Sequence, residues 1–171
     1  MQGFKVPIDK IIDRPGQYRD FRVQVELPEV STALAVLTAD PIDAHVRAES
    51  VVEGILVTGR VQGLARYACA RCLEEMVGEI ELEVCEMYVA PGREAPPEED
   101  SYKIDGVEMD LEPMLRDAVA LALPLNPLCR EDCAGLCARC GKDLNEGPCG
   151  CKEEEIDPRW AALSELRDKL A

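Results

Sequence analysis

Eight of the nine cysteines in this chain fall into four closely spaced pairs. One to three residues separate the members of each pair, so each pair can place two thiolates on one turn of the chain. A tetrahedral metal ion takes four such ligands, and the four pairs therefore supply enough thiolates for two sites. The candidate ligands are Cys69, Cys72, Cys129, Cys133, Cys137, Cys140, Cys149 and Cys151. Because this spacing suits structural zinc bound by cysteine alone, we expect two four-cysteine zinc sites, or at least one.

The two C-terminal pairs can close a local site by themselves. Cys137-Ala-Arg-Cys140-Gly141 has the form of a zinc knuckle, in which the glycine after the second cysteine lets the backbone turn with positive φ. Cys149-Gly150-Cys151 follows shortly after it, and Gly150 permits the tight bend that a one-residue gap requires.

The other site is an inference over a longer range. Cys69 and Cys72 need two partners, and Cys129 with Cys133 is the remaining pair. A grouping of Cys69 and Cys72 with the pair at 137–140 is the other reasonable choice. An iron–sulfur cluster would use the same ligands, and redox pairs or thiols without a metal are further alternatives.

The expected compartment supports metal sites over disulfides. Residues 1–10 contain no apolar stretch and no small-residue cleavage site of the kind found in signal peptides. No apolar run approaches the roughly 20 residues that span a bilayer. We therefore expect a cytoplasmic protein with no membrane partner. In that reducing environment, closely spaced cysteines are more often metal ligands or redox groups than structural disulfides.

The first ninety residues alternate apolar and polar side chains, a pattern that predicts strands. The stretch 58–89 is expected to be a hairpin whose tip carries Cys69 and Cys72. Its second strand should place Ile80, Leu82 and Val84 against a core, with Glu79, Glu81 and Glu83 as an acidic stripe on the other face. Gly54 and Gly59 are expected at bends or bulges.

The helical signals lie nearer the C-terminus. Asp110 is a good N-cap for a helix to about Leu123, and Asp157 with Pro158 predicts a second, C-terminal helix. Residues 129–151 contain too little apolar material to form a core of their own. The fold class expected is α+β: an antiparallel sheet or partial barrel, one packed helix, a zinc-ordered cysteine-rich segment and a C-terminal helix.

Two domains are expected from this pattern. Residues 1–128 would form an α+β core whose hairpin tip carries the Cys-x-x-Cys pair. Residues 129–171 would form the zinc-binding segment and the C-terminal helix, packed on that core.

Enzymatic chemistry has no candidate residues in this sequence. Sites closed by four thiolates leave no open position on the metal for water or substrate. By alternation, Cys85 lies on the acidic face of its strand, where neighbouring glutamates disfavour the thiolate, and His45 lies on a polar strand face. No phosphate loop, dinucleotide fingerprint or serine-nucleophile motif is present. We therefore expect a protein that is not an enzyme and takes no small-molecule substrate.

Four segments together resemble the YceD family, whose members are called large ribosomal RNA subunit accumulation proteins. The segments are Cys69-Ala-Arg-Cys72-Leu73, the stretch from Asp110 to Pro124, the stretch from Cys129 to Cys151, and Asp157-Pro-Arg159. The resemblance covers most of the chain from about residue 50 onward. It implies a cytoplasmic, non-enzymatic factor that supports accumulation of the large-subunit ribosomal RNA. It also agrees with two separable sites, the first formed by Cys69, Cys72, Cys129 and Cys133.

The charge of the chain indicates the kind of partner. With 19 basic and 34 acidic residues, the formal net charge is −15, which disfavours non-specific binding to phosphate backbones. The leading hypothesis is therefore a ribosome-biogenesis factor that binds a basic large-subunit ribosomal protein or a pre-ribosomal particle. Two alternatives stay open. One is secondary, direct rRNA contact through Arg130, Arg139 and Lys142; the other is a redox-sensitive zinc chaperone.

Overall fold

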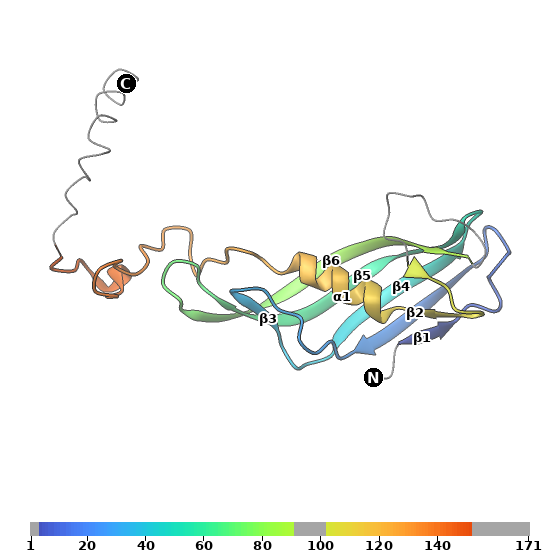
Figure 1. The fold of residues 1–171 in the computed structure, drawn as a ribbon, viewed down its shortest axis with the longest axis horizontal. Helices are drawn as coiled ribbons and strands as arrows, with labels where there is room; N and C mark the ends of the chain where they lie inside the picture. The colour runs from blue at the N-terminus through green and yellow to red at the C-terminus, as the bar shows by residue number, and fades with distance from the viewer. Residues whose placement is uncertain (1–3, 91–101, 152–171) are drawn as a thin grey trace, which may run out of the picture. The chain divides into compact units, whose positions relative to one another are not determined.

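The computed structural model describes residues 4–90 and 102–151, and the chain divides into two compact units, Met1–Cys133 and Ala134–Ala171. All the strands and the single α-helix of the described residues belong to the first unit (Figure 1). The elements in chain order are β1 (Lys5–Pro7), β2 (Tyr18–Val25), β3 (Ala35–Leu37), β4 (Ile42–Ser50), β5 (Gly54–Ala68), β6 (Glu75–Val89), β7 (Tyr102–Lys103), β8 (Glu108–Asp110), α1 (Glu112–Ala122) and the 3-10 helix η1 (Leu144–Glu146).

The main sheet of the first unit has six strands. Its spatial order is β2-β4-β5-β6-β7, and β3 pairs with the end of β5. The pairs are antiparallel except for the short parallel contact of β7 with β6. A separate two-stranded ribbon joins β1 to β8. Short connections join β4 to β5 and β5 to β6, and they explain the antiparallel arrangement of these pairs, because tight turns can join only antiparallel neighbours.

The hairpin of β5 and β6 is the longest element of the sheet, and it confirms the hairpin predicted at residues 58–89. Its two strands have 15 residues each, paired in register from Gly54 opposite Val89 to Ala68 opposite Glu75. Cys69 and Cys72 lie in the turn that joins the two strands. The predicted alternation also holds: Ile80 and Val84 are buried, Leu82 packs against the core, and Glu79, Glu81 and Glu83 are exposed.

Gly54 and Gly59 have a different role from the one predicted. Both lie inside β5 in unbroken register, without a bend or bulge. A Cβ atom at Gly54 would come within 2.0 Å of the Tyr88 carbonyl oxygen, and one at Gly59 within 2.2 Å of the His45 carbonyl oxygen. These glycines therefore permit neighbouring backbones to approach closely.

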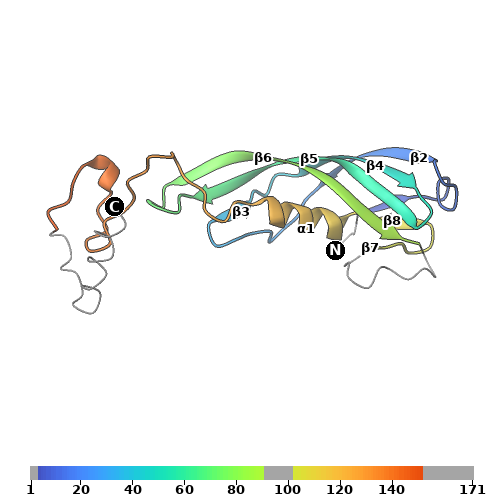
Figure 2. The same ribbon diagram turned by 90° about the horizontal axis from the view of Figure 1, so that it is seen from above.

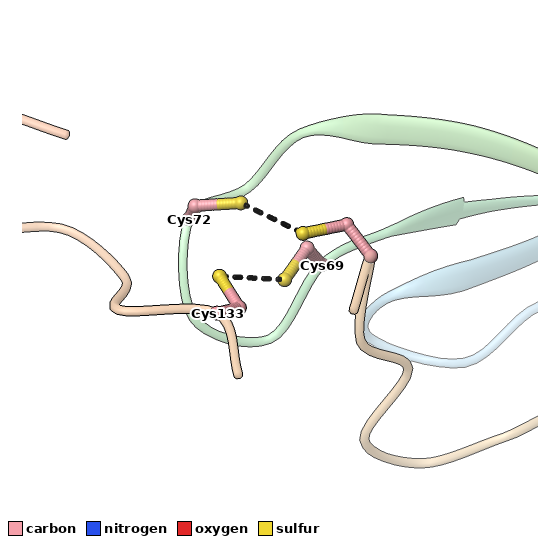
Figure 3. Close-up of side chains that lie close together, drawn as sticks. Cys69, Cys72 and Cys133 are labelled. Carbon is pink, nitrogen blue, oxygen red and sulfur yellow. Dashed lines mark hydrogen bonds between the residues drawn. The ribbon is translucent and has the colours of Figure 1, made fainter. Parts of the chain in front are cut away.

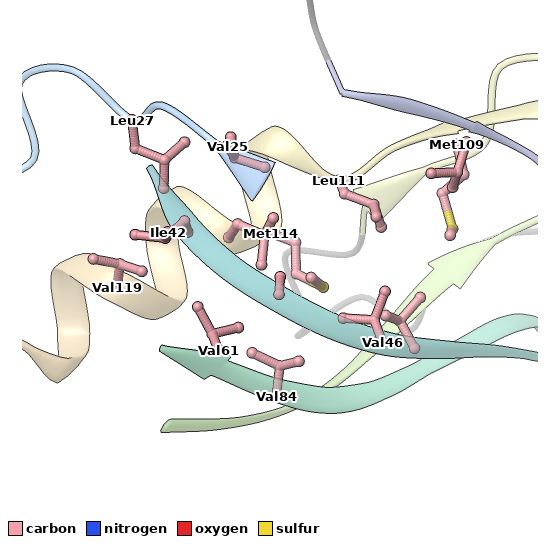
Figure 4. Packing of buried hydrophobic residues seen from close by; sticks show 14 of the residues in the cluster. Val25, Leu27, Ile42, Val46, Val61, Val84, Met109, Leu111, Met114 and Val119 are labelled. Atoms are coloured by element: carbon pink, nitrogen blue, oxygen red, sulfur yellow. The ribbon is translucent and has the colours of Figure 1, made fainter. Parts of the chain in front are cut away.

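The core lies between the inner face of the sheet and α1. Figure 2 shows α1 lying along one face of the sheet, and Figure 4 shows Met114 and Val119 of the helix beside Val61 and Val84 of the hairpin. The helix begins one residue later than an N-cap at Asp110 would place it, because the N-cap is Leu111, which makes no side-chain cap hydrogen bond. The Asp110 carboxylate still accepts a hydrogen bond of 3.0 Å from the amide of Glu112, the first residue of the helix. Burial of the face with Met114 and Val119 anchors the helix against the sheet. The chain that leaves the helix then reaches the hairpin tip.

The predicted α+β class with a partial barrel is wrong. The described residues are largely β, with one α-helix of 11 residues, and the main sheet is open. Among the described strands, β2 at one end of the sheet pairs with neither β6 nor β7 at the other end. The inner face is covered instead by α1 and by buried side chains of the β1–β8 ribbon, such as Val6 and Met109.

Some expectations fall on other parts of the chain. The C-terminal helix expected from Asp157 lies outside the described residues, and the division of the chain at residue 128 stays a prediction. No helix within residues 4–90 and 102–151 has the length and apolar character needed to cross a membrane.

Candidate metal centres

The eight paired cysteines gather into two groups of four. Within each group all four sulfur atoms lie within 4.8 Å of one another. The first group contains Cys69, Cys72, Cys129 and Cys133, and the second contains Cys137, Cys140, Cys149 and Cys151. This is the grouping that the sequence favoured, and it differs from the alternative that joined the pair at 69–72 to the pair at 137–140. All nine cysteines are free of disulfide bonds.

The first group has the dimensions of a tetrahedral site. The Sγ atoms of Cys69 and Cys133 are 3.8 Å apart (Figure 3). Those of Cys72 and Cys129 are 3.7 Å apart. A zinc–sulfur bond of about 2.3 Å gives a tetrahedron whose sulfurs are about 3.8 Å apart. A multi-iron cluster placed between the sulfurs would hold them farther from one another. The spacing therefore fits one ion surrounded by four thiolates.

A tight turn at the hairpin tip positions the first two sulfurs. The amide of Leu73 donates to the carbonyl oxygen of Cys69 at 2.9 Å, and Leu73 itself has a φ of 62°. The amide of Arg71 points at the Cys69 sulfur, 3.5 Å away. This arrangement bends the chain so that both side chains of the pair project to the same point.

The segment after α1 supplies the other two sulfurs and is fastened to the hairpin tip. The amide of Ala70 donates to the carbonyl oxygen of Pro127 at 2.7 Å. Arg71 Nη1 donates to the carbonyl oxygens of Cys133 at 2.8 Å and Glu131 at 3.2 Å. Sequence reasoning did not single out Arg71, because its hydrogen bonds across the site exist only once the two segments have come together.

Burial makes the first group a closed site. Cys69 is fully buried and Cys133 is 2% exposed, although the region contains few large apolar side chains. The backbone N–H groups of Cys129 and Cys72 lower the pKa of Cys69 to about 6, which favours the thiolate form that binds metals. Burial raises the pKa of Cys129, so an unligated thiolate there would be unfavourable without a cation beside it.

The second group is built on a similar turn but is more exposed. The amide of Gly141 donates to the carbonyl oxygen of Cys137 at 2.9 Å, and Gly141 has a φ of 71°, as predicted for this position. The Sγ atoms of Cys137 and Cys149 are 3.4 Å apart. Backbone N–H groups of Cys140 and Arg139 lower the pKa of Cys137 to about 6. Cys140 and Cys151 are exposed to solvent.

Polar contacts take the place of a core around the second group. Asn145 Oδ1 accepts a hydrogen bond of 2.7 Å from the amide of Ala134, and the Asp143 carboxylate accepts one of 2.8 Å from the amide of Asn145. Asp143 also pairs through its backbone with Leu136. Gly150 does not have the positive φ that would require glycine between Cys149 and Cys151.

The other sequence candidates, Cys85 and His45, belong to neither group. Cys85 is exposed and pairs across the hairpin with Thr58. His45 lies on the outer face of β4, where its Nδ1 atom is 3.4 Å from Nη2 of Arg22. Both positions agree with the faces expected from alternation.

Comparison with known proteins identifies one protein family and relatives that match most of this chain. A family profile described as "Large ribosomal RNA subunit accumulation protein YceD" matches residues 57–167. The uncharacterized protein Rv2926c of Mycobacterium tuberculosis is 37% identical over 167 residues, which cover 94% of this chain and 80% of that protein. The uncharacterized protein ML1660 of Mycobacterium leprae is 38% identical over 159 residues, covering 90% of this chain and 72% of that protein.

A plant protein matches over a shorter stretch. The chloroplastic "Large ribosomal RNA subunit accumulation protein YCED homolog 1" of Arabidopsis thaliana is 35% identical over 63 residues, covering 37% of this chain and 20% of that protein. No solved structure matches this chain.

Proposed function

The chain belongs to the YceD family of large ribosomal RNA subunit accumulation proteins, and from that membership we propose that it is a cytoplasmic, non-enzymatic ribosome-biogenesis factor. In this role it supports accumulation of the large-subunit ribosomal RNA by binding a basic ribosomal protein or an assembly intermediate. The observation that carries the proposal is the match of the family profile over residues 57–167, which include both cysteine groups.

Both cysteine groups hold structural zinc in this proposal. Four thiolates fill every position of a tetrahedral ion and leave none for water, so the ion cross-links the chain and does not activate a substrate. In the first group the cross-link joins the hairpin tip to the segment that follows α1. In the second it orders residues 134–151, which have little apolar material to bury. This function for the ion is the reason to expect no catalysis at either site.

Charge supports a basic protein as the partner. The chain has a formal net charge of −15, and each zinc bound by four thiolates would add about −2. A surface of this sign attracts a basic partner and repels the phosphates of free RNA. Charge complementarity of this kind acts mainly on the association rate and on the choice of partner.

The alternative of direct rRNA contact through the basic residues of the cysteine-rich segment has less support than a basic protein partner. Arg130 forms an ion pair of 3.5 Å with Asp132, and Lys142 Nζ donates to the carbonyl oxygen of Pro148 at 3.0 Å. Both cations therefore have acceptors within the protein. Nucleic-acid binding by these residues would have to compete with those contacts.

A redox-sensitive chaperone is the second candidate, because Cys140 and Cys151 are exposed. Peroxide would oxidise two zinc thiolates to a disulfide, with the two electrons reducing peroxide to water and the zinc released. Zinc that stays bound under mild peroxide, with unchanged partner binding, would remove this candidate.

Affinity capture of the full-length, zinc-loaded protein tests the proposed function. We expect large-subunit ribosomal proteins or particles among the captured partners, and we expect capture to weaken as the salt concentration rises. Capture that does not depend on the salt concentration, or a captured sample without any large-subunit component, would contradict the proposal.

A further inference from the structure

The outer edge of β6 is open over most of its length. One side of β6 pairs with β5 along all 15 residues, whereas the other side pairs only at Tyr88 and Val89, with β7. Within residues 4–90 and 102–151, no strand lies on the outer side of the stretch from Glu75 to Met87. A strand edge of this length presents a row of backbone N–H and C=O groups to which another strand can add.

Acidic side chains dominate this strand. β6 contains five glutamates and no lysine or arginine. Glu79, Glu81 and Glu83 lie at alternate positions on the outer face of the sheet. On the opposite face of the same strand, Ile80 and Val84 are buried and Leu82 is half-buried.

The neighbouring strand neutralises only part of this charge. Arg60 of β5 lies 3.2 Å from Glu81 and 3.7 Å from Glu83, and it is the one basic residue of the described chain that pairs with the stripe. Glu79 lies opposite Leu64 and has no ion pair within the described residues. One arginine for three exposed glutamates leaves the edge negative.

A second copy of the chain does not fit this edge. An antiparallel β6 centred on Glu81 would place Glu81 opposite its own copy and Glu79 opposite Glu83. Like charges directly opposite each other destabilise a strand pair, and natural proteins use charges in this way to prevent association of sheet edges. The occupant of the edge must therefore carry the opposite charge.

We propose that the edge of β6 from Glu75 to Met87 binds an extended basic segment of a partner protein as an added strand. The segment alternates lysine or arginine with apolar residues. Its basic side chains lie beside Glu79, Glu81 and Glu83, and its apolar side chains extend the face formed by Ile80, Leu82 and Val84. This inference rests on the proposed function and deepens it, since it assigns the surface at which a basic partner docks.

A synthetic peptide of alternating lysine and valine is the probe for this proposal. We expect the peptide to slow amide hydrogen exchange in β6 of the full-length, zinc-loaded protein. The outer edge of β2 is the internal control, because it is also unpaired among the described strands but carries both signs of charge, as in Arg19, Asp20 and Arg22. The proposal would be overturned if the peptide protected β2 and β6 equally, or if it protected neither strand.

Two comparisons separate strand addition from general charge attraction. A peptide of the same sequence, with N-methyl groups on the amides of one edge, keeps its charge but cannot pair there, and we expect it to lose the protection of β6. The variant E79Q/E81Q/E83Q should bind the unmodified peptide about tenfold more weakly. The matched variant D9N/D13N/E26Q removes three exposed carboxylates outside β6 and should bind nearly as the wild type does. Equal binding by the two variants, or by the two peptides, would contradict the proposal.

The proposed function can be tested apart from this surface. If E79Q/E81Q/E83Q captures ribosomal partners as well as the wild type does, the β6 edge is not the docking site and the proposed function stands. If the wild type itself captures none, the proposed function fails, whatever the peptide does.

Discussion

Leu73 and Gly141 occupy the same position in two separate turns, directly after a Cys-Ala-Arg-Cys sequence, and both have a positive φ, 62° and 71°. The turn thus imposes the same backbone conformation in both units, although only one has glycine at this position. A side chain with a Cβ atom is strained in this conformation by about 1 kcal/mol or more. Two backbone hydrogen bonds of 2.9 Å hold Leu73 there against that strain: its amide donates to the carbonyl oxygen of Cys69, and the amide of Cys69 donates to that of Glu74.

Substitution of these two residues should therefore have opposite effects. Gly141→Ala should cost about 1 kcal/mol and weaken metal binding at the second group about fivefold. Leu73→Gly should leave the first group at least as stable as in the wild type, since it removes the strain and an exposed leucine. Competition with a chromophoric chelator measures both changes. Gly150→Ala is the control, because nothing lies within 4 Å of its Cβ position and its φ is not positive.

Arg71 should stabilise the first group without being a ligand. Its guanidinium donates to the carbonyl oxygens of Cys133 and Glu131, so Arg71→Ala removes two links between the hairpin tip and the segment after α1. We expect a loss of about 1 kcal/mol in unfolding free energy, because the side chain is partly in water. Arg139→Ala, at the equivalent place in the second turn, should leave the unfolding of the β-sheet unit unchanged. Equal effects of the two substitutions on that unit would show that Arg71 has no special role.

The two groups should release metal at different rates. Cys69 and Cys133 of the first group are buried, whereas Cys140 and Cys151 of the second are exposed to any competing ligand. Chelator and mild peroxide should therefore remove metal from the second group first. Cys69→Ser leaves only the second group intact and Cys149→Ser only the first, so the two variants report the rates separately. Slower release from the Cys69→Ser protein than from the Cys149→Ser protein would contradict this expectation.

Gly59, in the middle of β5, should not tolerate a side chain. A Cβ atom there would lie 2.2 Å from the His45 carbonyl oxygen and 2.7 Å from Cα of Val46, both backbone atoms that cannot move without shifting β4. We expect Gly59→Ala to lower the unfolding free energy by about 2 kcal/mol. Denaturant unfolding measures the loss. Gly106→Ala is the comparison: it meets no atom within 4 Å and carries only the cost of its positive φ.

Local patterns predicted the parts of the structure that depend on local chemistry. The β5–β6 hairpin follows from strict alternation, and the turns of the two cysteine groups follow from spacing. The short strands β1, β3 and β8 have too few residues to show a pattern, and their pairing depends on distant partners. Gly59 was misinterpreted for a related reason, since its contact with His45 exists only once β4 and β5 have paired.

The fold class was predicted wrongly because it, too, depends on contacts between distant parts of the chain. Alternation shows that a strand has one buried face but does not show what covers that face. A closed barrel and an open sheet covered by a helix bury the same residues. In this protein the cover is α1 with the β1–β8 ribbon, whose Met109 is fully buried although β8 has only three residues.

Metal content per chain is the most direct test of the central claim, which is that two groups of four thiolates each bind one zinc ion. Protein purified without chelator should contain two equivalents of zinc. Cys69→Ser and Cys149→Ser should each contain one, the double variant none, and Cys85→Ser two. A well-ordered wild-type protein with no bound metal, or a single substitution that removes both equivalents or neither, would contradict the account.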